Sequence, residues 1–136
     1  MKIILILIAA IYIYALLSNL IVSRSENGKN FSSGKVPSIP AGFYKGKAPN
    51  QGSWLGKRFD ATSSSGINEF SEGEKYPFKM YVSSGVLKID YNNSQNPLWV
   101  RFILDELVEV DNYYLGRIQV RLPFYPVTIG FFTLEK

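Results

Sequence analysis

The chain has 136 residues, contains neither cysteine nor histidine, and carries a formal net charge of +4 at pH 7. Without these two residue types it cannot form a disulfide, a thiolate nucleophile, a histidine-dependent catalytic triad or a zinc site with the usual ligands. Its length fits one domain, and its hydrophobic fraction of 46% suffices for a core.

Residues 1–23 are predicted to form a transmembrane anchor. Lys2 is followed by a run to Val22 in which Ser18 and Asn19 are the strongly polar residues, and about 20 apolar residues suffice for a helix that spans the hydrocarbon core. The alternative is a cleaved signal peptide. The apolar run is longer than an h-region of about 7–15 residues, however, and no A-x-A cleavage motif follows it. We therefore expect a single-pass membrane protein.

The orientation in the membrane is indicated by two opposing signals. Arg24, Lys29 and Lys35 follow the helix and favour a cytoplasmic domain by the positive-inside rule. The Met-Lys start before a long apolar run resembles a signal anchor with its N-terminus inside, so we expect the domain on the extracytoplasmic side. Beyond residue 35 there are 11 basic and 10 acidic residues. This near-neutral domain has no basic stripe, and no nucleic-acid partner is expected.

The rest of the chain is predicted to be a flexible polar tether, residues 24–41, followed by an all-β domain, residues 42–136. The tether is rich in Ser, Gly, Asn, Lys and Pro, a composition that buries too little apolar surface to fold. In the domain, short aromatic and β-branched runs alternate with turn residues. The predicted strands are 54–60, 76–82, 86–91, 98–110, 114–122 and 127–134. Joined as antiparallel hairpins, they predict a small antiparallel β-barrel behind one transmembrane helix.

The hairpin around residues 111–113 has two possible registers. A three-residue loop pairs Val110 with Tyr114 and gathers apolar side chains on one face and charged ones on the other. A two-residue loop sets Leu104 against Gln119 and mixes the faces, which a half-buried sheet disfavours. We therefore predict the three-residue loop.

In that register Glu106 is the exception on the apolar face, where it lies opposite Ile118. A bulge would turn its carboxylate outward; otherwise it is a polar group inside a ligand cavity. Asp105 and Glu109 fall on the other face, as part of a solvated ladder of charges.

The last predicted strand is apolar on both faces and follows the run Leu122-Pro123-Phe124-Tyr125-Pro126. Strands of this kind form walls whose outer side is covered, and exposed apolar patches often mark interfaces. The residues predicted to contact a protein partner are Leu122, Phe124, Tyr125 and Phe132.

Two segments with glycines around large aromatic residues open the domain. Residues 42–46 read Gly-Phe-Tyr-Lys-Gly, and residues 52–59 read Gly-Ser-Trp-Leu-Gly-Lys-Arg-Phe. Glycines in this setting permit tight turns and close backbone approach while a ring closes one end of a barrel. The residues predicted to have this structural role are Gly42, Gly46, Gly56, Lys57 and Phe59.

These segments resemble the GXWXG-type proteins of unknown function. The second segment matches their W-x-G-K-x-F element, whereas Tyr44 stands where the first element has tryptophan. The pattern of the companion domain is similar to Ile89-Asp90-Tyr91-Asn92, Pro97-Leu98, Arg101-Phe102 and Tyr114-Leu115-Gly116. The resemblance implies a lipocalin-like, or calycin-like, small barrel and supplies no reaction.

Three functions are compared. The favoured one is a non-catalytic, membrane-anchored accessory or structural subunit that docks other membrane-protein subunits through its barrel. The alternative is a tethered carrier of a lipid, quinone or pigment, with Tyr44, Trp54 and Glu106 as ligand-binding residues. An enzyme is not expected, because no nucleophile elbow, phosphate loop or dinucleotide motif is present. No cofactor or metal is expected.

Overall fold

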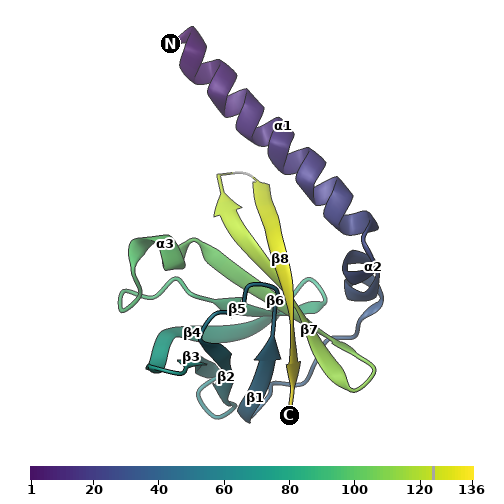
Figure 1. Ribbon diagram of the computed structural model, residues 1–136, viewed down its shortest axis with the longest axis vertical. Coiled ribbons are helices and arrows are strands. Elements are labelled where there is room, and N and C mark those ends of the chain that lie inside the picture. The colour runs from purple at the N-terminus through teal and green to yellow at the C-terminus, as the bar shows by residue number, and fades with distance from the viewer. Residues whose placement is uncertain (124) are drawn as a thin grey trace.

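Eight antiparallel strands close into a barrel beside a long N-terminal helix (Figure 1). The structure is a computed structural model and describes residues 1–123 and 125–136. Each strand pairs with the next in the chain, and β8 closes the barrel on β1. The elements are α1 (Lys2–Arg24), α2 (Glu26–Ser33), β1 (Gly42–Lys47), β2 (Trp54–Asp60), β3 (Ser65–Phe70), β4 (Gly73–Ser83), β5 (Val86–Asp90), α3 (Leu98–Arg101), β6 (Ile103–Val110), β7 (Tyr113–Leu122) and β8 (Tyr125–Glu135).

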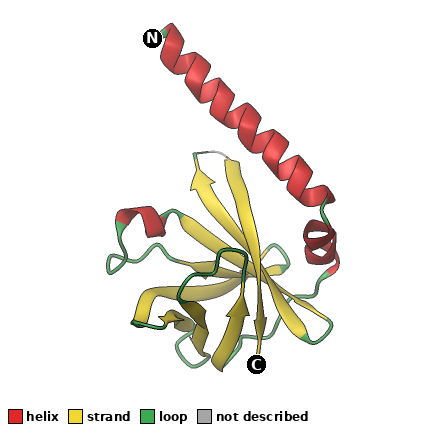
Figure 2. Cartoon of the chain, viewed as in Figure 1, coloured by secondary structure: helices red, strands yellow, loops and turns green. Residues whose placement is uncertain are grey.

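The prediction of an all-β barrel behind one apolar helix is confirmed. Two strands, β1 and β3, are missing from the predicted set, and one predicted strand needs correction. The sequences of β1 and β3 contain glycine and polar residues and few β-branched ones, so they lack the usual strand signal. The predicted strand 98–110 begins instead with the single helical turn α3 after Pro97. Figure 2 shows this turn in the long connection between β5 and β6.

The two ends of the barrel differ in their connections. One end, called here the α3 end, carries the connections β1–β2, β3–β4, β5–β6 and β7–β8. The opposite end carries the connections β2–β3, β4–β5 and β6–β7. The opposite end is filled by the barrel's own rings, because Tyr44 packs against both Phe59 and Tyr114.

The register predicted for the β6–β7 hairpin is wrong. Val110 pairs with Tyr113, and Leu104 pairs with Gln119, so the loop has two residues. Asp111 in this loop has a φ of 51°, a left-handed conformation that Asp and Asn tolerate and that two-residue hairpins need. Compared with the predicted register, this one-residue shift moves every side chain of β6 to the opposite face of the barrel wall relative to β7.

The segment predicted to be a flexible tether contains a helix packed on the barrel. Helix α2 begins after Ser25, whose hydroxyl accepts a hydrogen bond from the backbone N–H of Gly28, as N-caps do. Phe31 of α2 is buried against Val108 and Leu115 on the outer surface of the barrel. The single apolar side chain of Phe31 faces the barrel and thus packs a segment whose average composition is polar.

Helix α1 is long and apolar enough to cross a membrane. Its apolar side chains are mostly exposed, while Ala15 is buried. The end of α1 near Arg24 lies beside α2, and the helix then runs past the β7–β8 hairpin toward the α3 end (Figure 1).

The close approach of Trp54 to β1 generates a stability prediction. A Cβ at Gly46 would lie 2.3 Å from the nearest atom of the Trp54 ring, whereas the nearest atom to a Cβ at Gly130 would lie 3.8 Å away. We expect Gly46→Ala to lower the free energy of unfolding by about 1–3 kcal/mol through overpacking. Gly130→Ala is the matched control and should not lower it. Urea denaturation in detergent measures both, and equal losses in the two variants would contradict the packing described here.

Candidate functional site

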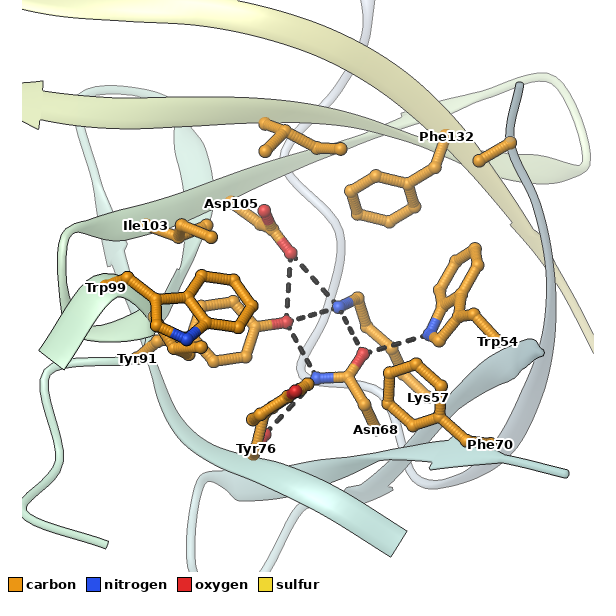
Figure 3. A pocket seen from close by; sticks show the side chains of 13 residues that line it. Trp54, Lys57, Asn68, Phe70, Tyr76, Tyr91, Trp99, Ile103, Asp105 and Phe132 are labelled. Carbon is orange, nitrogen blue, oxygen red and sulfur yellow. Dashed lines mark hydrogen bonds and ion pairs between the residues drawn. The ribbon is translucent and has the colours of Figure 1, made fainter. Parts of the chain in front are cut away.

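An apolar cavity of about 210 Å³ lies inside the barrel at the α3 end. Aromatic rings from several strands and from α3 form most of its wall, as Figure 3 shows. The residues that line it are Ala48, Trp54, Lys57, Asn68, Phe70, Tyr76, Tyr91, Trp99, Val100, Ile103, Asp105, Ile118 and Phe132.

A buried ion pair forms one side of the cavity. Lys57 and Asp105 are 3% and 4% exposed, and the Lys57 Nζ lies 3.0 Å from the Asp105 Oδ2. The ammonium also donates to Asn68 Oδ1 at 2.9 Å and to the hydroxyl of Tyr91. Its three N–H donors therefore have three acceptors, as a buried charge requires.

The partners of Lys57 are connected to one another. The Tyr91 hydroxyl donates to Asp105 Oδ2 at 3.0 Å and accepts from Asn68 Nδ2 at 3.0 Å. The indole N–H of Trp54 donates to Asn68 Oδ1 at 3.0 Å, which orients the ring along the cavity wall (Figure 3). The polar atoms thus satisfy one another and leave ring faces toward the cavity.

Aromatic rings surround the Lys57 ammonium as well. The Nζ lies 5.0–5.6 Å from the ring centroids of Trp54, Phe78, Tyr91 and Phe132, within the range of cation–π attraction. Burial lowers the pKa of Lys57, and the charge of Asp105 opposes this effect. Burial also raises the pKa of the Tyr91 phenol, so at neutral pH it is the un-ionised donor that the network needs.

A bulge in β2 places both Trp54 and Lys57 inside the barrel. The pairing of β2 with β3 shifts between Trp54 and Gly56, so the alternation of inward and outward side chains skips one residue. A Cβ on Gly56, which has a φ of 150°, would lie 2.0 Å from the carbonyl oxygen of Tyr44. Glycine therefore permits the bulge beside β1.

The predicted ligand-binding residues separate in the structure. Trp54 lines the cavity, but Tyr44 stacks on Tyr114 at the opposite end of the barrel, with a centroid distance of 5.3 Å. Of the predicted structural residues, Lys57 lines the cavity and the buried ring of Phe59 belongs to the core. Gly42 lies at the start of β1 with a φ of 87°.

Glu106 was predicted to be either a cavity residue or a residue turned outward by a bulge. It does face outward, but neither the cavity position nor the bulge is present, because β6 pairs with β7 without a register shift. Glu106 pairs with Arg117 across the regular β6–β7 ladder and lies on the outer face. Its carboxylate accepts from Arg117 at 2.6 Å and contacts Lys88. The Arg117 guanidinium stacks on Phe31 of α2, 4.3 Å from the ring centroid. Glu106 is therefore buried by two cations beneath α2 rather than by a ligand.

The predicted partner residues are only partly at the surface. Phe132 is 4% exposed and packs edge-on against Trp54 inside the barrel, because β8 turns this side chain inward; its assignment to an interface is wrong. Leu122 and Tyr125 are half-buried near the tip of the β7–β8 hairpin. Phe124 lies outside the described residues.

Sequence reasoning missed Asn68, Tyr91 and Asp105 as cavity residues. A two-residue turn at Asp111-Asn112 would have predicted the position of Asp105. In that register Asp105 lies beside Ile118 on the inner face of the barrel. No local pattern marks Asn68, and the motif that contains Tyr91 carried no prediction of a cavity. The two residues reach Lys57 from 11 and 34 residues away.

Comparisons of the chain with protein-family models, curated proteins and solved structures found no match. The resemblance to the GXWXG-type proteins therefore stays a prediction. Within residues 1–123 and 125–136, no group of three or more His, Cys, Asp or Glu residues is arranged to hold a metal ion.

The buried pair generates a second stability prediction. Lys57→Met leaves Asp105 as an uncompensated buried charge and should lower the free energy of unfolding by about 3–5 kcal/mol. The double variant Lys57→Met/Asp105→Leu should recover most of that loss, because an apolar pair needs no counter-charge.

The exposed pair Lys75–Glu72, at 2.9 Å, provides the control. Lys75→Met should leave the free energy of unfolding almost unchanged, because both partners of this pair are exposed. Chemical denaturation measures all three variants. A double variant less stable than Lys57→Met would show that Asp105 does not depend on Lys57 for its counter-charge.

Proposed function

We propose that this protein is a membrane-anchored binding module whose barrel holds a small apolar group, such as the end of a lipid chain or one ring of a larger molecule. The observation that carries this proposal is the aromatic cavity at the α3 end. A polar network closed on itself and a wall of ring faces favour an apolar occupant over a charged one.

The volume of the cavity limits the occupant. Pockets for drug-sized molecules occupy about 300–1,000 Å³, and 210 Å³ lies below this range. An apolar cavity of about 150 Å³ admits a benzene ring. The cavity therefore suits one ring or a short length of chain, and the remainder of a larger lipid or quinone would extend beyond Trp99, which is 63% exposed.

The position of the cavity favours entry from a bilayer. Helix α1 has the length and apolarity of a membrane span, and it points past the end of the barrel where the cavity lies (Figure 1). If α1 crosses the membrane once, as we propose, the α3 end faces the bilayer on whichever side the barrel lies. An apolar ligand then passes between lipid and cavity over a short distance.

An accessory subunit of a membrane complex is the second candidate function. The observation in its favour is the exposed apolar surface of Leu98, Trp99 and Phe102 around α3, since such patches often mark interfaces. Native mass spectrometry after gentle extraction separates the candidates. A bound mass of a few hundred daltons on the monomer supports the binding module, and stoichiometric protein partners without such a mass support the subunit.

A fluorescence experiment tests the cavity directly. The chain has two tryptophans, so Trp99→Phe leaves Trp54 as the single reporter on the cavity wall. We expect a brominated fatty acid in detergent micelles to quench Trp54 in this background. Adding Ala48→Phe, which places a ring in the cavity from the β1–β2 connection, should abolish most of the quenching.

Ala41→Phe is the matched control, because Ala41 is exposed and precedes β1 at the opposite end of the barrel. It should leave the quenching of Trp54 unchanged. Equal quenching in both phenylalanine variants would mean that the quencher does not enter the cavity, and an unquenched Trp99→Phe parent would reject an acyl chain as occupant.

A further inference from the structure

The tip of the β7–β8 hairpin extends beyond the rest of the barrel wall. The two strands stay paired as far as Leu122 and Tyr125, whereas β1 pairs with β8 at residues 133–135 and β6 reaches β7 at Val120. From Leu122 to Leu134 the sequence has no charged residue. An apolar two-stranded ribbon therefore projects from the α3 end, beside α1 (Figure 1).

One face of α1 contacts this ribbon. The Tyr12 hydroxyl donates to the carbonyl oxygen of Pro123. Asn19 donates to the carbonyl oxygen of Pro126 at 2.7 Å and accepts from the backbone N–H of Thr128 at 2.9 Å. Positions 12, 15 and 19 share one helix face, and the buried, small Ala15 lies between the two polar residues.

We propose that the hairpin tip, taken here as residues 122, 123 and 125–127, enters the acyl-chain region of a lipid bilayer alongside α1. This inference rests on the proposed membrane anchoring of α1. Tyr12, which reaches the tip, is twelve residues from Arg24 at the end of the helix, or about 18 Å along its axis at 1.5 Å per residue. The headgroup region on one side of a bilayer is about 5–8 Å thick. With the charged Arg24 placed at the membrane surface, the tip would therefore lie deeper than the headgroups.

Several polar backbone groups in and beside the tip have partners that do not require water. Lipid offers no hydrogen bonds, so exposed N–H and C=O groups need partners within the protein. Pro123 and Pro126 have no N–H to satisfy. Their carbonyl oxygens, and the N–H of Thr128, bond to the side chains of Tyr12 and Asn19.

The surface next to the tip has the composition of a membrane boundary. Leu98, Trp99 and Phe102 are exposed around α3, and tryptophan is enriched at the level of lipid headgroups. Arg101 and Arg121 line a surface hollow between α3 and the hairpin. Arg121 pairs with Asp90 at 2.7 Å, and basic residues at this level would favour anionic headgroups. This continuity from α1 through the tip to α3 favours a bilayer over a protein partner as the occupant.

Site-specific labelling tests this inference, because the natural chain has no cysteine. Single cysteines are introduced into the full chain as Pro123→Cys at the tip, Ile8→Cys on α1 and Asn112→Cys in the β6–β7 loop at the opposite end. Each variant is labelled with an environment-sensitive fluorophore and reconstituted into phosphatidylcholine vesicles containing 10% lipid with a nitroxide on the acyl chain. Leu122→Cys replaces Pro123→Cys if the latter does not fold.

We expect the labels at positions 123 and 8 to be quenched several-fold more strongly than the label at position 112. Quenching at position 8 without quenching at position 123 overturns the inference and leaves the anchoring of α1 intact. Absence of quenching at both positions overturns the anchoring and the inference together. A tip cysteine that is protected from a water-soluble maleimide yet not quenched is covered by protein, which also overturns the inference.

Discussion

The buried ammonium of Lys57 is the constraint on which the interior of the barrel depends. A charge removed from water needs a counter-charge and a hydrogen-bond acceptor for each donor. Asp105 on β6, Asn68 on β3 and Tyr91 after β5 meet this need from three different parts of the wall. Each of these contacts ties a different part of the barrel wall to β2. The same contacts set the directions of the rings, so the shape of the cavity follows from the satisfaction of one lysine.

The outer surface of the barrel is a second packed layer rather than a solvated face. Phe31 on α2 covers Val108 and Leu115, and the Glu106 carboxylate lies beneath the same helix with Arg117. Asn19 on α1 bonds to the backbone of β8. The apolar helix, the following segment and the barrel are therefore held together by contacts on the outer side of β6, β7 and β8, and they do not divide into an anchor, a loose tether and an independent domain.

The wall formed by β6, β7 and β8 is thus packed on its inner and its outer face. This explains which parts of the structure could be predicted from the sequence. The apolar run of α1 and the alternation of turns and aromatic strands are local signals, and they indicated the helix and the barrel. The β6–β7 register was assigned by assuming one apolar face and one solvated face. The inner face carries Asp105 and the outer face carries Val108, so that assumption selected the wrong loop. The contact between Asn19 and Thr128 spans 109 residues and has no local signature.

The location of the cavity determines which interactions would contribute to the binding free energy of an occupant. At the opposite end the stacked rings of Tyr44 and Tyr114 fill the interior, so an occupant would enter at the α3 end. If that end faces a bilayer, an apolar group would leave other acyl chains rather than water. The hydrophobic effect then contributes little to binding, because the area removed from water is small. Affinity would instead come from packing against the rings of Trp54 and Phe132, and such contacts depend steeply on shape. A flat ring or a bent chain that fills the cavity would therefore be selected over lipid in general.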